Sequence, residues 1–163
     1  MTEHVDLTRI QAANRSIPPS VLTYEAAPRP MSFAGALGSD AAKTALLDGL
    51  RAHIDFALQP IVNIHTGTLF AFEALLRGHA KLGFAAIHDL FDALHESGML
   101  YTADTVLRDI ALGKFAKLSH EHHYKLFYNL DNRIINAPDY KRGNTLKLIE
   151  RHNLPINAIC FEI

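Results

Sequence analysis

The chain has 163 residues, with 16 Lys and Arg against 17 Asp and Glu, and a formal net charge of −1 at pH 7. This balance argues against a nucleic-acid polymer or an anionic membrane as the main partner, since both select for an excess of basic residues. The single cysteine, Cys160, excludes an internal disulfide and fits a reducing compartment. No apolar run approaches the ~18 residues of a membrane span, and the first residues lack a signal-peptide pattern. We therefore expect no membrane segment and a cytoplasmic location.

Residues 1–38 contain four prolines and little hydrophobic periodicity, which predicts a flexible leader. The folded domain is then expected over residues 39–163. It would begin with a short helix that has Asp40 as its cap and Leu46 and Leu50 along one side.

Two apolar runs at 56–63 and 69–76 are predicted to form a pair of short strands. The segment between them contains Gly67, which favours a tight turn, so the two runs predict a hairpin. Side chains two and four residues apart on a strand point to the same face. The hairpin would therefore place Glu73 and Arg77 on one face.

Glu73 lies among apolar residues, where a carboxylate is costly unless a cation, a metal ion or a proton neutralises it. An ion pair with Arg77 is the simplest interpretation from the residues alone. A metal site is the alternative.

The rest of the chain alternates helices and strands. Apolar residues at helical spacing predict helices at about 87–98, 102–118 and 144–152, and apolar runs predict strands at 125–130 and from Ala158 onward. This alternation is typical of a parallel α/β sheet.

In a (β/α)₈ barrel, functional groups gather at the C-terminal ends of the strands, and Asn129 and Glu162 both lie near such ends. A barrel of this type requires roughly 250 residues, so the pattern accounts for about half of one. The expected fold is therefore α/β, a partial TIM-type barrel that starts with a hairpin. An open half barrel exposes an unpaired edge, which predicts that the chain is truncated or is completed by another chain.

Several motifs occur in order along the chain. Gln59 begins Q-P-I-V-N, a T-G turn follows, and Glu73 begins E-A-L-L-R. Later, Asn129 ends the run L-F-Y-N before Leu-Asp, and Glu162 ends I-C-F-E before the final isoleucine. Together these segments, over roughly residues 48–163, resemble the first half of the EAL domain family.

The resemblance implies a phosphodiesterase that hydrolyses cyclic di-GMP to the linear dinucleotide pGpG with Mg²⁺ or Mn²⁺. It implies that Glu73, Asn129 and Glu162 are metal ligands and that Glu73 is a catalytic residue. Arg77 would bind a phosphate oxygen, and Gln59 would lie at the edge of the ligand site. The paired aspartates and the lysine of the family do not occur before Ile163, so we expect this chain to be inactive by itself.

A second interpretation is a degenerate EAL module that binds cyclic di-GMP or only a protein partner, and a second chain could cover the open half barrel. A third is an α/β fragment whose likeness to the family is structural only. The sequence departs from the family at Asn63, Ala71 and Asp131, where aspartate, glycine and serine are usual.

Three further features are interpreted as structural. The run His120–His123 suggests zinc, but its spacing is not H-E-x-x-H and no cysteine is near, so a solvated turn is the better interpretation. Asp104 matches a helix position that is common in the family. Cys160 is expected to be a small core residue.

Overall fold

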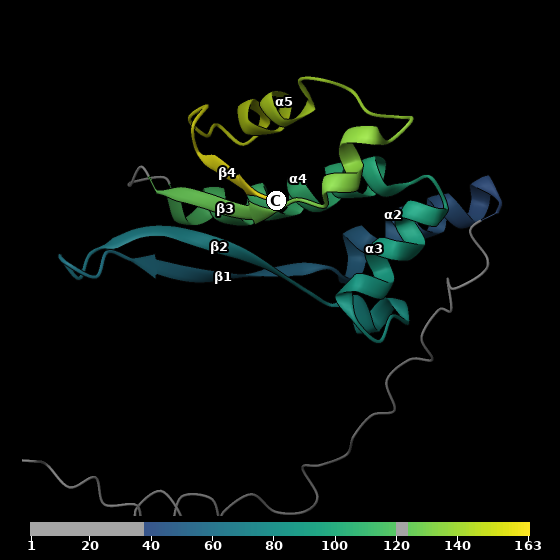
Figure 1. Ribbon diagram of the computed structural model, residues 1–163, viewed down its shortest axis with the longest axis horizontal. Coiled ribbons are helices and arrows are strands. Elements are labelled where there is room, and N and C mark those ends of the chain that lie inside the picture. Colours follow the sequence, from purple (N-terminus) through teal and green to yellow (C-terminus); the bar gives the residue numbers. More distant parts are fainter. Residues whose placement is uncertain (1–37, 120–123) are drawn as a thin grey trace, which may run out of the picture.

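The computed structural model describes residues 38–119 and 124–163, which form a four-stranded sheet with helices (Figure 1). Residues 1–37 of the predicted leader and the histidine run at 120–123 lie outside the described residues. The four strands are β1 (Asp55–Val62), β2 (Leu69–Arg77), β3 (Lys125–Asn129) and β4 (Ile159–Glu162). Their order in the sheet is their order in the chain.

The hairpin of β1 and β2 is antiparallel, whereas β3 and β4 continue the sheet in parallel to β2. The hairpin turn is held at both of its ends. The Asn63 side chain accepts hydrogen bonds from the backbone of His65 and Thr66, and Gly67 has φ 67°, a left-handed conformation that favours glycine. The predicted hairpin is therefore confirmed, and β2 extends to Arg77.

One helix precedes β1, and the others occupy the connections between strands. They are α2 (Asp40–His53), α3 (Ile87–Glu96), α4 (Leu100–Ser119) and α5 (Asn144–Arg151), with short 3₁₀ helices η2 (His79–Leu82) and η3 (Asn132–Asn136). None of the helices in the described part is long and apolar enough to cross a membrane. The predicted alternation is confirmed, although neither η2 nor η3 was expected.

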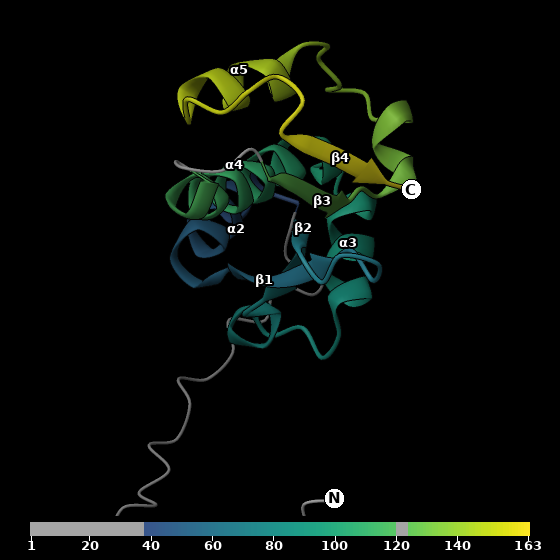
Figure 2. The same cartoon turned by 90° about the vertical axis from the view of Figure 1, so that its left-hand side faces the viewer.

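The core lies between the sheet and α4, which packs along one face of the strands (Figure 2). Phe72 of β2 meets Phe115 of α4 edge to face, with ring centroids 6.3 Å apart. Tyr128 of β3 is fully buried, and its ring lies near Phe161 on the neighbouring strand β4 and near Phe56 on β1, two strands away. We call this the covered face of the sheet and the opposite one the open face.

Three local expectations were wrong. Ser39, not Asp40, caps α2, because the Ser39 hydroxyl accepts a hydrogen bond from the backbone of Ala42. Leu118, which helical spacing assigns to the apolar face of the helix at 102–118, is instead 52% exposed near the end of α4. Cys160 is only half-buried, because it is in register with Phe127 on the open face and not in the core.

Candidate functional site

Sheet register brings the predicted site residues onto neighbouring strands. Gln59 of β1 lies directly opposite Glu73 of β2, and Glu73 is in register with Phe127 of β3. Asn129, two residues further along β3, is in register with Glu162 of β4. Residues in register, and residues two apart on one strand, share a face of the sheet. These four of the five predicted site residues therefore lie on the open face.

Glu73 and Asn129 are in direct contact. The Asn129 Nδ2 donates a hydrogen bond of 3.1 Å to the Glu73 Oε1, along the diagonal between the two parallel strands. Glu73 is half-buried, whereas Asn129 and Glu162 are exposed at the ends of their strands. The structure thus brings the first two residues together, and the register places Glu162 beside Asn129.

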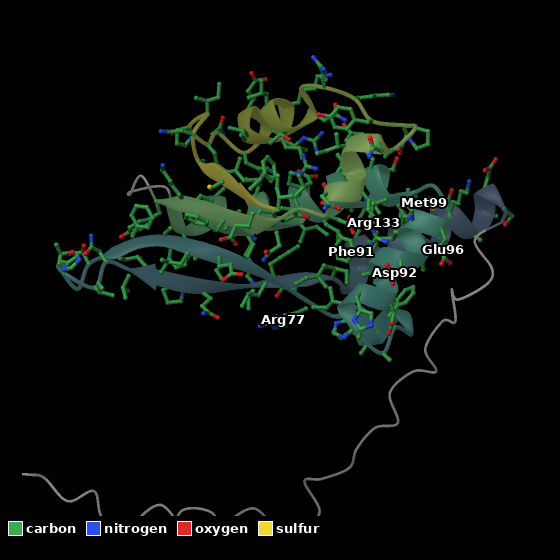
Figure 3. The ribbon with its side chains drawn as sticks, in the orientation of Figure 1. Arg77, Phe91, Asp92, Glu96, Met99 and Arg133 are labelled. Carbon is green, nitrogen blue, oxygen red and sulfur yellow. The ribbon has the colours of Figure 1, made fainter. Side chains whose placement is uncertain are left out.

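Arg77 does not neutralise Glu73. Its Nη1 donates a hydrogen bond of 2.9 Å to the backbone oxygen of Leu76, and the side chain is exposed at the end of β2 (Figure 3). Within the described residues, Glu73 has no ion pair with any cationic side chain. The ion pair considered from the sequence is therefore not formed.

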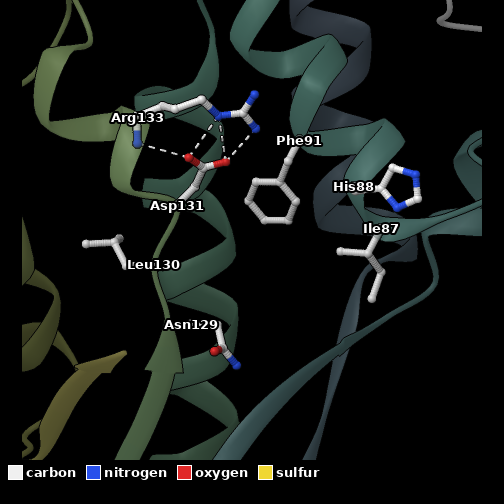
Figure 4. Close-up of a pocket in the computed structure, with 7 residues that line it drawn as sticks. All are labelled: Ile87, His88, Phe91, Asn129, Leu130, Asp131 and Arg133. Carbon is white, nitrogen blue, oxygen red and sulfur yellow. Dashed lines mark hydrogen bonds and ion pairs between the residues drawn. The ribbon is translucent and has the colours of Figure 1, made fainter. Parts of the chain in front are cut away.

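A cavity of about 490 Å³ opens beside Asn129, between the end of β3 and α3 (Figure 4). Ile87 and Phe91 of α3 line it on one side, and Asn129 and Arg133 line it on the other. A smaller cavity of about 250 Å³ shares Ile87, Phe91 and Asn129 and is also lined by Arg77. Asn129 and Arg77 therefore line the same space at the strand ends.

The donor set fits a hard divalent cation. Glu73 and Glu162 supply carboxylate oxygens and Asn129 supplies an amide oxygen, and oxygen ligands are those that Mg²⁺ and Mn²⁺ prefer. No group of three His, Cys, Asp or Glu residues that could hold a metal occurs in the described part of the chain. The amide of Asn129 is therefore needed to complete three protein ligands.

The residues after Asn129 form a clamp that was not predicted. Asp131 accepts hydrogen bonds from the backbone N–H, the Nε and the Nη2 of Arg133 (Figure 4). The Arg133 Nη1 donates a hydrogen bond of 2.8 Å to Asp92 of α3. These hydrogen bonds lower the pKa of Asp131 and raise the pKa of Arg133. The clamp fixes the end of β3 against α3. The D-x-R spacing was the only sequence signal for it.

Asp104 is fully buried on the covered face and pairs with Arg108 one helical turn away. The Tyr128 hydroxyl donates a hydrogen bond of 3.0 Å to the same carboxylate. Burial raises the pKa of Asp104, and the Arg108 charge opposes this increase. Burial and the nearby carboxylate raise the pKa of Tyr128 well above its ordinary value. These contacts agree with the structural interpretation of Asp104.

Comparisons with known proteins agree with this architecture. A search of curated proteins found no match. A standalone versatile EAL protein from Vibrio cholerae O395, solved with c-di-GMP bound, shares 32% identity and has a TM-score of 0.50. That match covers 66% of this chain and 43% of the Vibrio chain.

Two further solved structures show the same fold at lower identity. Klebsiella pneumoniae BlrP1, solved with FMN and cyclic diGMP, shares 20% identity with this chain and has a TM-score of 0.54. That match covers 66% of this chain and 28% of the BlrP1 chain. The PaMucR phosphodiesterase, in complex with c-di-GMP, shares 17% identity with a TM-score of 0.52 and covers 67% of this chain and 45% of its own. This chain spans less than half the length of each of the three.

The expected fold is confirmed: the sheet, entered through a hairpin, corresponds to about half of an EAL-type barrel. The sequence also matches the family model described as EAL domain, over residues 41–163. The chain belongs to the EAL domain family.

Proposed function

We propose that this EAL domain binds cyclic di-GMP at the C-terminal ends of its parallel strands, together with Mg²⁺ or Mn²⁺. The observation that carries the proposal is the contact between Glu73 and Asn129 across β2 and β3, with Glu162 in register beside Asn129. Three oxygen donors on neighbouring strand ends suit a cation that bridges to a phosphate. The solved c-di-GMP complexes of other EAL proteins support the choice of ligand.

Each residue has a role in this proposal. Glu73, Asn129 and Glu162 would hold the cation, which when bound neutralises phosphate charge and activates water for phosphodiester hydrolysis. Arg77, whose guanidinium group is suited to a phosphate oxygen, would hold the dinucleotide in the cavity that it shares with Asn129. Gln59, opposite Glu73, would contact the edge of the ligand.

The reaction that we propose for an enzyme containing this domain is hydrolysis of one phosphodiester bond to give linear pGpG. We propose that these 163 residues bind the dinucleotide but do not turn it over, because the described sheet leaves its open face uncovered and only Glu73 lies there as a half-buried carboxylate. A cytoplasmic location is part of the same proposal, since a lone cysteine fits a reducing compartment.

Calorimetry on the 163-residue chain tests the binding step. Cyclic di-GMP with Mn²⁺ should bind, and both Glu73→Gln and Asn129→Ala should weaken binding by about tenfold or more, since metal ligands are lost. Glu150→Gln is the matched control, because Glu150 is exposed on α5 away from the open face. Equal affinity of the wild type and Glu73→Gln would contradict the metal assignment.

A phosphodiesterase assay separates the enzyme from a binding module. We expect no pGpG from the 163-residue chain with Mn²⁺. Turnover at ordinary enzyme rates would contradict the predicted inactivity. A chain that binds neither Mn²⁺ nor cyclic di-GMP would instead favour the second interpretation, a module that serves a protein partner.

A further inference from the structure

A separate cavity of about 260 Å³ lies on the other side of the sheet, between α4, η3, the segment that leads into α5, and β4. Its lining includes Tyr101 and Arg108 of α4, Lys141 and Thr145 before and within α5, and Phe161 of β4. Phe161 belongs to the covered face, so this cavity is distinct from the one beside Asn129. Its volume of about 260 Å³ can hold a compact group.

Arg108 in the wall of this cavity has one donor without an acceptor. The residue is 4% exposed, and its guanidinium carbon lies 5.2 Å from the centroid of the Phe161 ring. Nη2 pairs with Asp104, and Nη1 donates a hydrogen bond of 2.5 Å to the Thr145 hydroxyl. Nε is buried and, among the described residues, has no partner. A buried N–H without an acceptor is costly, so Arg108 retains one donor for a further hydrogen bond.

The N-terminus of α5 supplies further donors to the same cavity. Its cap, Gly143, has φ 85° and no side chain, so no side-chain hydrogen bond caps the helix. The first amides of a helix have no partner within the helix, and they carry the positive end of its dipole. Gly143, Asn144 and Thr145 all line the cavity. This end of α5 therefore favours an anion.

The hydroxyl groups around the cavity also leave donors free. Thr145 Oγ1 accepts from Arg108, so its own proton remains available. The Tyr101 hydroxyl, in contrast, already uses its proton. It donates a hydrogen bond of 2.6 Å to the backbone oxygen of Lys141 and accepts one of 2.7 Å from the Asn144 Nδ2. The unsatisfied groups that line this cavity are thus donors, and Lys141 adds a positive charge at its exposed edge.

We propose that this cavity binds a compact oxyanion, a phosphate group, held by the Thr145 hydroxyl, the first amides of α5 and the Arg108 guanidinium. Asp104 balances the charge of Arg108, so the charge of the anion is met by Lys141 and the helix dipole. The same chemistry serves inorganic phosphate and the terminal phosphate of a monoester. The site does not depend on the proposed binding of cyclic di-GMP.

Nuclear magnetic resonance on the ¹⁵N-labelled 163-residue chain tests the proposal in a phosphate-free buffer. Inorganic phosphate should shift the backbone amide signals of residues 144–146 and the Nε–H signal of Arg108, and the shifts should saturate. Thr145→Val should weaken the apparent Kd about fivefold, as expected for the loss of one hydrogen bond worth ~1 kcal/mol. Lys141→Gln, which changes an exposed side chain, should also weaken binding without affecting folding.

Control experiments distinguish a specific binding site from nonspecific association. Thr44→Val, which removes an exposed hydroxyl on α2, should leave the Kd unchanged. Shifts that do not saturate by about 10 mM, or that persist unchanged in Thr145→Val, would overturn the proposal. Acetate bound as tightly as phosphate would overturn the assignment to a tetrahedral anion. Guanosine monophosphate that reproduces the shifts would support a monoester as the source, whereas a response to inorganic phosphate alone would support the free ion.

Discussion

Two adjacent residues of β3, Tyr128 and Asn129, point to opposite faces of the sheet, and each donates a hydrogen bond to a carboxylate. On the covered face the carboxylate is Asp104, which is fully buried and paired with Arg108. On the open face it is Glu73, which is half-buried and whose only partner in the described part of the chain is the Asn129 amide.

This difference separates a structural acid from the acid of the candidate site. A buried carboxylate that carries its own counter-charge is complete, and it needs nothing from solution. A carboxylate that accepts a hydrogen bond from an amide and forms no ion pair has oxygen lone pairs available for a metal ion. The same strand therefore stabilises the fold through one residue and presents the candidate site through the next.

Removing the acid on the covered face should have the largest effect. Asp104→Ala leaves Arg108 buried without a counter-charge and Tyr128 without its acceptor. We expect the free energy of unfolding to fall by about 3–5 kcal/mol, the range for breaking a buried ion pair. Urea denaturation followed by circular dichroism measures it.

A double variant tests the physical reason. Asp104→Leu combined with Arg108→Met replaces both charges by apolar groups, and it should recover most of the stability lost in Asp104→Ala. If the double variant is as unstable as Asp104→Ala, uncompensated charge is not the cause.

Aromatic truncation compares the packing of the two faces. Phe115 is fully buried against Phe72, so Phe115→Ala should cost about 3–4 kcal/mol through lost burial and a residual cavity. Phe127, half-buried on the open face, contacts Phe70 with ring centroids 6.3 Å apart, and Phe127→Ala should cost only about 1 kcal/mol. Equal losses in urea denaturation would show that the open face is packed as tightly as the covered one.

The clamp that joins the two regions should give a smaller effect that depends on pH. Arg133 lowers the pKa of Asp131 below its ordinary value of 3.8, so the folded state releases this proton more readily than the unfolded chain. The stabilisation is therefore complete above about pH 4 and is lost as pH falls through the lower pKa of the folded state. Asp131→Asn should cost about 1 kcal/mol at pH 7, because solvent screens the partly exposed pair.

Denaturant melts of the wild type and Asp131→Asn at pH 7 and at pH 3 measure this dependence. The difference in stability between the two proteins should shrink at the lower pH. A difference that stays constant would mean that the carboxylate charge does not contribute. Asp131→Ser, which introduces the residue usual in the family, should behave like Asp131→Asn at both values.

The open face was more accessible to sequence reasoning than the covered face. Asn129 and Glu162 each end an apolar strand, and parallel strands place their ends at one edge, so the local pattern predicted that these two lie close together. Glu73 was grouped with them only through the resemblance to the EAL family. The Asp104–Arg108 spacing of four residues is compatible with a helical ion pair. Its burial, however, depends on Tyr128, which is 24 residues away.

The clamp shows even more clearly that local sequence patterns do not reveal contacts between residues far apart in the chain. Asp131 and Arg133 are near in sequence, but Asp92 joins them from 41 residues away, across a packing of α3 on η3 that no periodicity reveals. Cys160 was assigned to the core because its strand is apolar, whereas strand register places it on the open face. Local pattern predicts which elements form, and tertiary contact decides which of their polar groups are satisfied.

The smallest change in stability is expected at the candidate site itself. Without metal, Glu73→Gln should alter the free energy of unfolding by no more than about 0.5 kcal/mol, since the amide oxygen still accepts from Asn129 and no ion pair is lost. With Mn²⁺ at 100 times its Kd, the wild type should gain about 2.7 kcal/mol, because a ligand bound only by the folded state stabilises it. Thermal melts with and without Mn²⁺ measure this gain, which Glu73→Gln should lack and Glu150→Gln should retain. A strong loss of stability in metal-free Glu73→Gln would place Glu73 with Asp104 as a structural acid, and the contrast between the two faces would then fail.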